Sequence, residues 1–198
     1  MMTILLTGFE PFLDHKSNPS QQLVEWANAN RPALQDLTGA KILTGLLPVS
    51  YDRSVKAVES ILKSNNVDFI LMFGLAANRS CISLEMMAQK HCNSNSPDAD
   101  QVILKNQTSN TSAKADYLKS IWPLEDWENE MKSLSIPAEV SLDAGGYVCN
   151  FLYFNMLQLT KNCLFVHLPQ KNDPLILQEA VYFLLKKLSQ SIVLSIDP

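Results

Sequence analysis

The chain has 198 residues, of which 46% are hydrophobic and 18% are charged, and this composition is typical of a globular protein with a sizeable core, not of a disordered chain. The formal net charge of −4 and the lack of a long basic run argue against nucleic-acid binding. No apolar stretch approaches the length of a membrane span, and residues 1–9 lack the basic leader of an export signal.

Short apolar runs bounded by glycine, proline or polar residues predict β-strands. In chain order they are residues 3–7, 40–47, 67–73, 81–88, 138–142 and 164–168. Apolar residues at helical spacing predict helices between these strands, and a proline favours the start of the first and of the last helix. The expected helices are residues 20–30, 51–64, 124–134, 151–159 and 174–188. Residues 192–196 form either a last short strand or a tail.

Residues 89–113 show no clear periodicity and are rich in Asn, Ser, Thr and Asp. This composition predicts a long loop, with one short strand at residues 102–104. Long loops in compact domains are usually functional or mobile. We therefore expect this segment to be mobile and to cover a binding site.

Two loops follow expected strands and are candidates for the walls of a ligand site. The first carries Phe9 and Phe12, which either form such a wall or fill the core. The second begins with Leu75, directly after the buried strand 67–73 and its terminal Gly74.

The stretch DAGGYVCN at residues 143–150 has the pattern of a glycine turn between a strand and a helix. Gly145 and Gly146 permit a sharp turn, and Cys149 then falls in the first turn of the helix. The N-terminus of a helix stabilises a thiolate, which makes Cys149 a candidate nucleophile. The alternative is that Cys149 is a small buried hydrophobic residue.

Two further residues carry chemistry near the ends of expected strands. Glu85 lies in an apolar run, and by alternation it is expected on the solvent-facing side of its strand, with a site as the alternative. His167 lies near the end of strand 164–168, where a lone histidine has either a structural or a catalytic role. A thiol, an imidazole and an acid are the three groups that cysteine peptidase chemistry requires.

The surrounding segments resemble pyroglutamyl-peptidase I, the cysteine peptidase family that removes an N-terminal pyroglutamyl residue from peptides. The likeness is carried, in the family's order, by LLTGFEPF (5–12), NPS (18–20), LPV (47–49), SLEMMA (83–88), SLDAGGYVCN (141–150) and FVHLP (165–169). These segments are similar to the family's LLTGFEPF, NPS, LPV, TVERVA, SNTAGTFVCN and FIHVP, and they extend over nearly the whole chain.

The resemblance implies a catalytic triad of Glu85, Cys149 and His167. It also implies one three-layer α/β/α domain over residues 1–198, with a twisted, mixed and mostly parallel sheet. It implies no metal or other cofactor, and assembly into homodimers or homotetramers. The four cysteines show no metal-ligand spacing and are expected to be reduced thiols of a cytoplasmic protein.

The chain departs from the family in the loops that would hold the substrate. Leu75 stands where bacterial members have Gln, Asn95 where they have Arg, and Tyr147 where they have Phe. Phe151 stands where many members have His, and residues 13–14 replace a glycine pair. From the matching positions, the residues expected to bind substrate are Phe9, Phe12, Leu75, Tyr147 and Val148.

Two hypotheses follow from the kept triad and the changed loops. The first is a peptidase for N-terminal pyroglutamyl residues, with weakened or altered specificity because polar partners of the ring are lost. The second is a relative that binds a peptide or a small cyclic amide without turnover. A nucleoside phosphorylase, suggested by a similar architecture alone, is less favoured because the chain lacks a phosphate-binding glycine loop.

Overall fold

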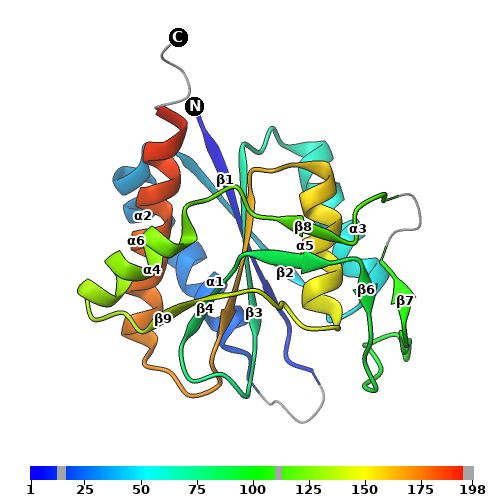
Figure 1. Cartoon of the computed structure of the whole chain (residues 1–198). Helices are drawn as coiled ribbons and strands as arrows, with labels where there is room; N and C mark the ends of the chain where they lie inside the picture. Colours follow the sequence, from blue (N-terminus) through cyan, green and yellow to red (C-terminus); the bar gives the residue numbers. More distant parts are fainter. Residues whose placement is uncertain (13–16, 110–112, 194–198) are drawn as a thin grey trace.

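The computed structural model describes residues 1–12, 17–109 and 113–193. Six strands of this part of the chain form one twisted sheet in the order β2-β1-β3-β10-β4-β9 (Figure 1). Their bounds are β1 (Thr3–Phe9), β2 (Lys41–Leu47), β3 (Phe69–Leu75), β4 (Ile82–Glu85), β9 (Ala138–Ser141) and β10 (Cys163–Leu168). All neighbours pair in parallel except β10 and β4, which are antiparallel. The expected mixed, mostly parallel sheet is thus confirmed.

Helices cover both faces of the sheet and complete the three expected layers (Figure 1). On one face lie α1 (Pro19–Ala29), α2 (Arg31–Thr38), α4 (Leu124–Ser133) and α6 (Pro174–Val193), and on the other lie α3 (Tyr51–Ser64) and α5 (Val148–Leu159). Successive side chains of a strand point to opposite faces, so on β1 Ile4 and Leu6 join the core of the first face while Leu5 joins that of the second. Because both faces are covered, the strands at the centre of the sheet are continuously apolar.

Local signals explain where helices begin. The Asn18 side chain accepts a hydrogen bond from the Ser20 amide at 3.0 Å, and Pro19 occupies the first position of α1. The Ser50 hydroxyl accepts one from the Arg53 amide at 3.1 Å and caps α3. Such caps satisfy amides that have no partner within the helix.

Several expected boundaries are wrong. Strand β3 continues through Gly74 to Leu75, and the strand expected at residues 81–88 breaks at Met86 into β4 and β5 (Met87–Gln89). Residues 102–104 do not form a strand; instead, β6 (His91–Cys92) pairs with β7 (Gln107–Thr108). Helix α2 and strand β8 (Tyr117–Lys119), which pairs with β5, were not expected from the sequence.

The last helix is longer than expected. Helix α6 extends to Val193, so residues 192 and 193 are helical and not part of a strand, and residues 194–198 lie outside the described part of the chain. Among the described residues, no helix combines the length and the apolar character needed to cross a membrane.

Candidate active site

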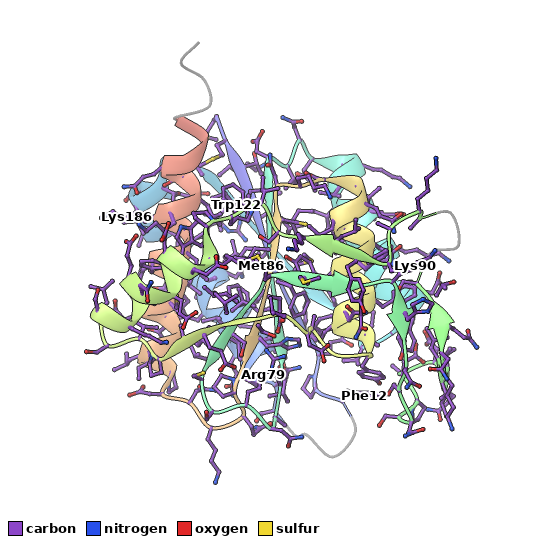
Figure 2. All side chains as sticks on the ribbon, viewed as in Figure 1. Phe12, Arg79, Met86, Lys90, Trp122 and Lys186 are labelled. Atoms are coloured by element: carbon purple, nitrogen blue, oxygen red, sulfur yellow. The ribbon has the colours of Figure 1, made fainter. Side chains whose placement is uncertain are left out.

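A cavity of about 430 Å³ lies where β1 and β3 end and α5 begins. It is lined by Phe9, Phe12, Asn18, Val49, Leu75, Ala77, Asn78, Ser94, Ser96, Tyr147, Val148 and Cys149. All five residues that the sequence analysis assigned to substrate binding are among them, and so is the candidate nucleophile. Figure 2 places Phe12 and Arg79 at this same end of the molecule.

The Cys149 thiol rests against the sheet at Gly74. A Cβ atom added to Gly74 would lie 2.9 Å from Cys149 Sγ and 2.8 Å from the Phe165 ring, closer than such atoms approach in proteins. Gly74 is the register partner of His167 in the parallel pair of β3 and β10, and register partners project to the same face. The thiol, the Phe165 ring and the His167 ring therefore occupy one face of the sheet, and the two rings lie 4.9 Å apart between centroids.

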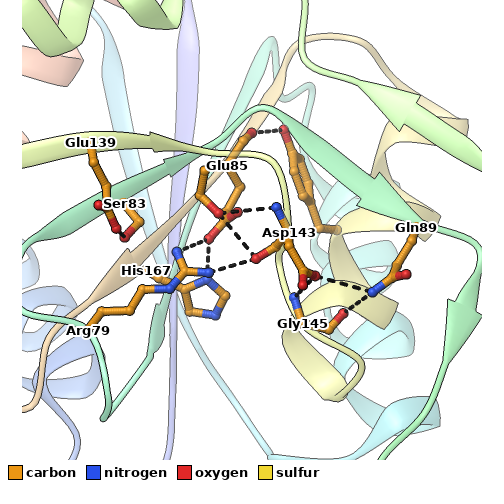
Figure 3. Close-up of polar contacts among 10 residues, drawn as sticks. Arg79, Ser83, Glu85, Gln89, Glu139, Asp143, Gly145 and His167 are labelled. Carbon is orange, nitrogen blue, oxygen red and sulfur yellow. Dashed lines mark hydrogen bonds and ion pairs between the residues drawn. The ribbon is translucent and has the colours of Figure 1, made fainter.

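Glu85 and His167 are joined by a hydrogen bond of 2.7 Å between Glu85 Oε1 and His167 Nδ1 (Figure 3). The expectation that Glu85 faces solvent is wrong: the residue is 0% exposed, because β4 lies between β10 and β9 and the sheet is covered on both faces. A carboxylate only accepts hydrogen bonds, so Nδ1 carries the proton and Nε2 is the basic nitrogen.

Arg79, which the sequence analysis did not single out, holds Glu85 from the loop after β3. Its guanidinium contacts Glu85 Oε1 at 2.5 Å and donates to the Asp143 carbonyl at 2.7 Å (Figure 3). One side chain thus links the acid of the expected triad to the segment that leads into α5. A lone arginine in a loop has no spacing pattern that would have identified it.

The glycine turn before Cys149 is held by hydrogen bonds on both sides. The Asp143 carboxylate accepts from the Gly145 amide at 2.8 Å, and the Gln89 side chain donates to the Gly145 carbonyl at 2.9 Å. Gly145 has a φ of +83°, and a Cβ atom on Gly146 would lie 2.7 Å from the Asn93 carbonyl oxygen. The predicted sharp turn is confirmed, and both positions require glycine.

Asn150, the residue after the thiol, locks the start of α5 to β5. Its side chain is fully buried, accepts from the Gln89 amide and donates to the Gln89 carbonyl, both at 2.8 Å. This two-point contact fixes the position from which the Cys149 side chain projects. The sequence analysis included Asn150 in the motif without giving it this role.

Burial decides the protonation state of the thiol. Burial first, and then the Glu85 carboxylate, raises the pKa of Cys149 to about 12, while Arg79 and the residue's own amide act in the opposite direction. The thiol is therefore protonated at neutral pH. Desolvation thus opposes the stabilisation of a thiolate that is expected from the helix N-terminus.

Residues 93–104, which we call the polar wall, contribute Ser94 and Ser96 to the lining of the cavity. Asp98 is 1% exposed, and its carboxylate accepts hydrogen bonds from the amides of Tyr51, Asp100 and Val102 at 2.8 to 2.9 Å. A buried carboxylate that accepts several amide hydrogen bonds fixes the chain around it. The polar wall is thus anchored to the first turn of α3.

A second contact ties the polar wall to the nucleophile helix. The Tyr147 hydroxyl donates to the Pro97 carbonyl at 2.7 Å, and the Tyr147 ring packs edge-on against Tyr51 at 5.6 Å. The expectation that residues 89–113 are mobile and cover the site stays a prediction. Residues 110–112 of the expected loop lie outside the described part of the chain.

Two of the departures from the resembled family, Leu75 and Tyr147, line this cavity. Ser94 and Ser96, the neighbours of Asn95, line it as well. Phe151 packs against Tyr51 with 5.2 Å between ring centroids. The departure at residues 13–14 lies outside the described residues.

The chain is similar to known proteins over most of its length. A family model described as pyroglutamyl peptidase matches residues 2–181. The pyrrolidone-carboxylate peptidase of Deinococcus radiodurans is 32% identical over 182 residues, covering 85% of this chain and 78% of the relative. That of Thermosipho melanesiensis is 30% identical over 174 residues, covering 85% of this chain and 83% of the relative.

Solved structures show the same fold. The crystal structure of pyrrolidone carboxyl peptidase from Fervidobacterium islandicum AW-1 matches with a TM-score of 0.84 and 30% identity, covering 96% of this chain and 99% of that one. The enzyme from Thermococcus litoralis matches with a TM-score of 0.88 at 23% identity, covering 98% and 96%.

Proposed function

Because this chain belongs to the pyroglutamyl peptidase family, we propose that it hydrolyses the amide bond between an N-terminal pyroglutamyl residue and the rest of a peptide. The observation that carries this proposal is the Glu85–His167 hydrogen bond on the sheet face against which the Cys149 thiol rests. A thiol that lines a cavity, together with an imidazole and an orienting acid at the same face of the sheet, provides the parts of a cysteine peptidase.

In the first step His167 acts as general base and Cys149 as nucleophile. Nε2 takes the thiol proton while Sγ forms a bond to the carbonyl carbon of the pyroglutamyl residue. Glu85 accepts from Nδ1–H and stabilises the imidazolium that forms. Since burial raises the pKa of Cys149 to about 12, this proton transfer accompanies attack and does not precede it.

The tetrahedral intermediate places a negative charge on the former carbonyl oxygen. The first amides of α5 have no partners within the helix and supply candidate donors for this oxyanion. The C–N bond then breaks, the leaving amine takes the proton from Nε2, and a thioester on Cys149 remains. Water, deprotonated by His167, attacks the thioester, which releases pyroglutamic acid and returns the proton to Sγ.

The remaining cavity residues suit a flat, uncharged ring. Phe9 and Phe12 supply aromatic faces, and Leu75 and Val148 add apolar surface. Tyr147, tied to Pro97 through its hydroxyl, keeps its ring at the cavity edge. We assign these five residues to binding of the pyroglutamyl ring.

The test is cleavage of a pyroglutamyl anilide by the wild type, Cys149→Ala and Cys81→Ala. Cys81 is also a half-buried free thiol but does not line the cavity, so it is a matched control. We expect the wild type and Cys81→Ala to release aniline and Cys149→Ala to release none. A folded wild type that cleaves no pyroglutamyl substrate would favour the relative that binds without turnover.

We also propose that the protein acts in the cytoplasm as a homodimer or homotetramer. All four cysteines lie in the described part of the chain and are free thiols, which suits a reducing compartment. Light scattering after size-exclusion chromatography measures the oligomer; a monomer at micromolar concentration would contradict this part of the proposal.

A further inference from the structure

The Glu85 carboxylate has an unusual distribution of partners. Its oxygen Oε1 contacts both Arg79 and His167, at 2.5 and 2.7 Å, while Oε2 has no hydrogen-bond partner among the described residues. The side chain is 0% exposed. A buried carboxylate is stable only with a charged or strongly polar partner. Arg79 and His167, the two residues that contact Oε1, therefore have to stabilise the negative charge of Glu85.

We propose that Arg79 is a positioning residue that neutralises Glu85, so that His167 stays unprotonated and available as the base. This inference rests on the proposed function. With Arg79 in place, the carboxylate already has a cation at contact distance and does not need a protonated imidazole. Without Arg79, His167 is the remaining partner, and the buried carboxylate holds a proton on it.

The groups around the pair support this assignment. From α5, the Tyr153 hydroxyl donates to the Glu85 carbonyl, not to its carboxylate, and Cys149 brings a neutral thiol. From β9, Glu139 accepts from the Ser83 hydroxyl, and in the next loop the Asp143 carboxylate accepts from the Gly145 amide. Within the described part of the chain, Arg79 is the one Lys or Arg side chain in contact with Glu85.

The Arg79 guanidinium contributes a fixed geometry as well as a positive charge. One nitrogen contacts Glu85 and another donates to the Asp143 carbonyl, and the Asp143 carboxylate in turn accepts from the Gly145 amide. Arg79 therefore holds the acid and the turn before Cys149 in one arrangement (Figure 3). A lysine keeps the charge but has a single ammonium group, which cannot reproduce the planar two-pronged contact.

The charge of Arg79 and the geometry of its guanidinium can be tested separately by two substitutions. In Arg79→Met, removal of the cation makes the Glu85–His167 pair take up its proton at higher pH, whichever member holds it. The acidic limb of the kcat/KM profile then moves up by about one pH unit or more, and activity on that limb falls about tenfold. In Arg79→Lys, the limb stays near its wild-type position, while the plateau rate falls because one prong is lost.

The experiment measures two pH profiles for wild type, Arg79→Met, Arg79→Lys and Arg31→Met. One profile is kcat/KM for a pyroglutamyl anilide, and the other is the rate of Cys149 alkylation by iodoacetamide, followed by mass spectrometry. Arg31 begins α2, in the layer on the opposite face of the sheet, so Arg31→Met removes the same charge away from the site. We expect Arg31→Met to follow the wild type and Arg79→Met to shift the acidic limb of both profiles.

An acidic limb that stays in place in Arg79→Met, or that moves equally in Arg31→Met, would overturn the inference. If the wild type cleaves no pyroglutamyl substrate, the proposed function fails, and the alkylation profile still tests Arg79. If Arg79→Met does not fold, Arg79→Lys decides. If the acidic limb of Arg79→Lys stays at its wild-type position and the plateau rate falls, the inference is supported. A shifted acidic limb or an unchanged plateau rate in Arg79→Lys contradicts it.

Discussion

The two sides of the cavity are built in different ways. Gly74, Glu85 and His167 lie on buried strands of one sheet, and Cys149 lies in the first turn of a helix packed on that sheet. The polar wall, residues 93–104, contains no helix or strand. It is held by hydrogen bonds to the buried Asp98 carboxylate, by the Tyr147 hydroxyl and by backbone hydrogen bonds to Val49 and Gly146. Regular secondary structure places the first set, whereas individual hydrogen bonds place the second.

This difference predicts different responses to substitution. On the sheet side, a misplacement of about 1 Å separates reacting groups and can lower the rate about 100-fold. On the polar wall, lost contacts change the shape and order of a binding surface. We therefore expect sheet-side variants to lower kcat, and polar-wall variants to alter KM and stability first.

The largest effect is expected from Gly74→Ala. The Cβ of the new alanine would lie 2.9 Å from Cys149 Sγ and 2.8 Å from the Phe165 ring. The thiol would therefore be displaced from its position against the sheet. We expect kcat for a pyroglutamyl anilide to fall about 100-fold or more, with a smaller change in KM. Steady-state kinetics measure both.

Gly45→Ala is the matched control on β2, which β1 separates from β3. The closest atom to its added Cβ is the flexible Ile61 Cδ1 at 3.0 Å, and the Thr7 and Leu5 side chains follow at 3.7 and 4.0 Å. We expect it to retain kcat. A double variant, Gly74→Ala with Phe165→Leu, removes the ring contact and keeps the thiol contact. Recovery of activity in that double variant would show that the ring, and not the displaced thiol, causes the loss.

Asp98→Ala is the next largest change. It removes the acceptor of three amide hydrogen bonds, from Tyr51, Asp100 and Val102. Leaving buried amides unsatisfied lowers the free energy of unfolding by about 1–3 kcal/mol, which urea unfolding measures, and we expect KM to rise. Unchanged stability together with unchanged KM would show that Asp98 does not hold the polar wall.

The features that could be predicted from the sequence also differ between the sheet side and the polar wall. Local patterns made Glu85, Cys149 and His167 candidates near the ends of expected strands and at a helix start, and the resemblance to a family implied that they form a triad. The sequence analysis placed Glu85 on the wrong side of its strand, because alternation does not reveal that both faces of β4 are covered. The contacts of Arg79 with Glu85 and Asp143, of Asp98 with Tyr51, and of Asn150 with Gln89 join residues that are 6 to 64 positions apart, and no local pattern encodes them.

The smallest effect is expected from Tyr147→Phe, which removes only the hydroxyl that donates to the Pro97 carbonyl at 2.7 Å. One neutral hydrogen bond contributes about 0.5–1.5 kcal/mol, which corresponds to a rise in KM of about two- to tenfold. We expect kcat to stay near the wild-type value. A loss confined to kcat would mean that Tyr147 acts on the reaction and not on the polar wall.

Affinity labelling with a pyroglutamyl chloromethyl ketone at neutral pH tests most directly whether Cys149 is the nucleophile and His167 its base. The reagent carries the pyroglutamyl ring to the cavity, where a thiol displaces chloride and forms a stable C–S bond that peptide mapping locates. We predict a single adduct on Cys149, much slower labelling in His167→Ala, and protection by a pyroglutamyl aldehyde. An adduct on Cys81, or labelling of Cys149 at the same rate in His167→Ala, would contradict the account.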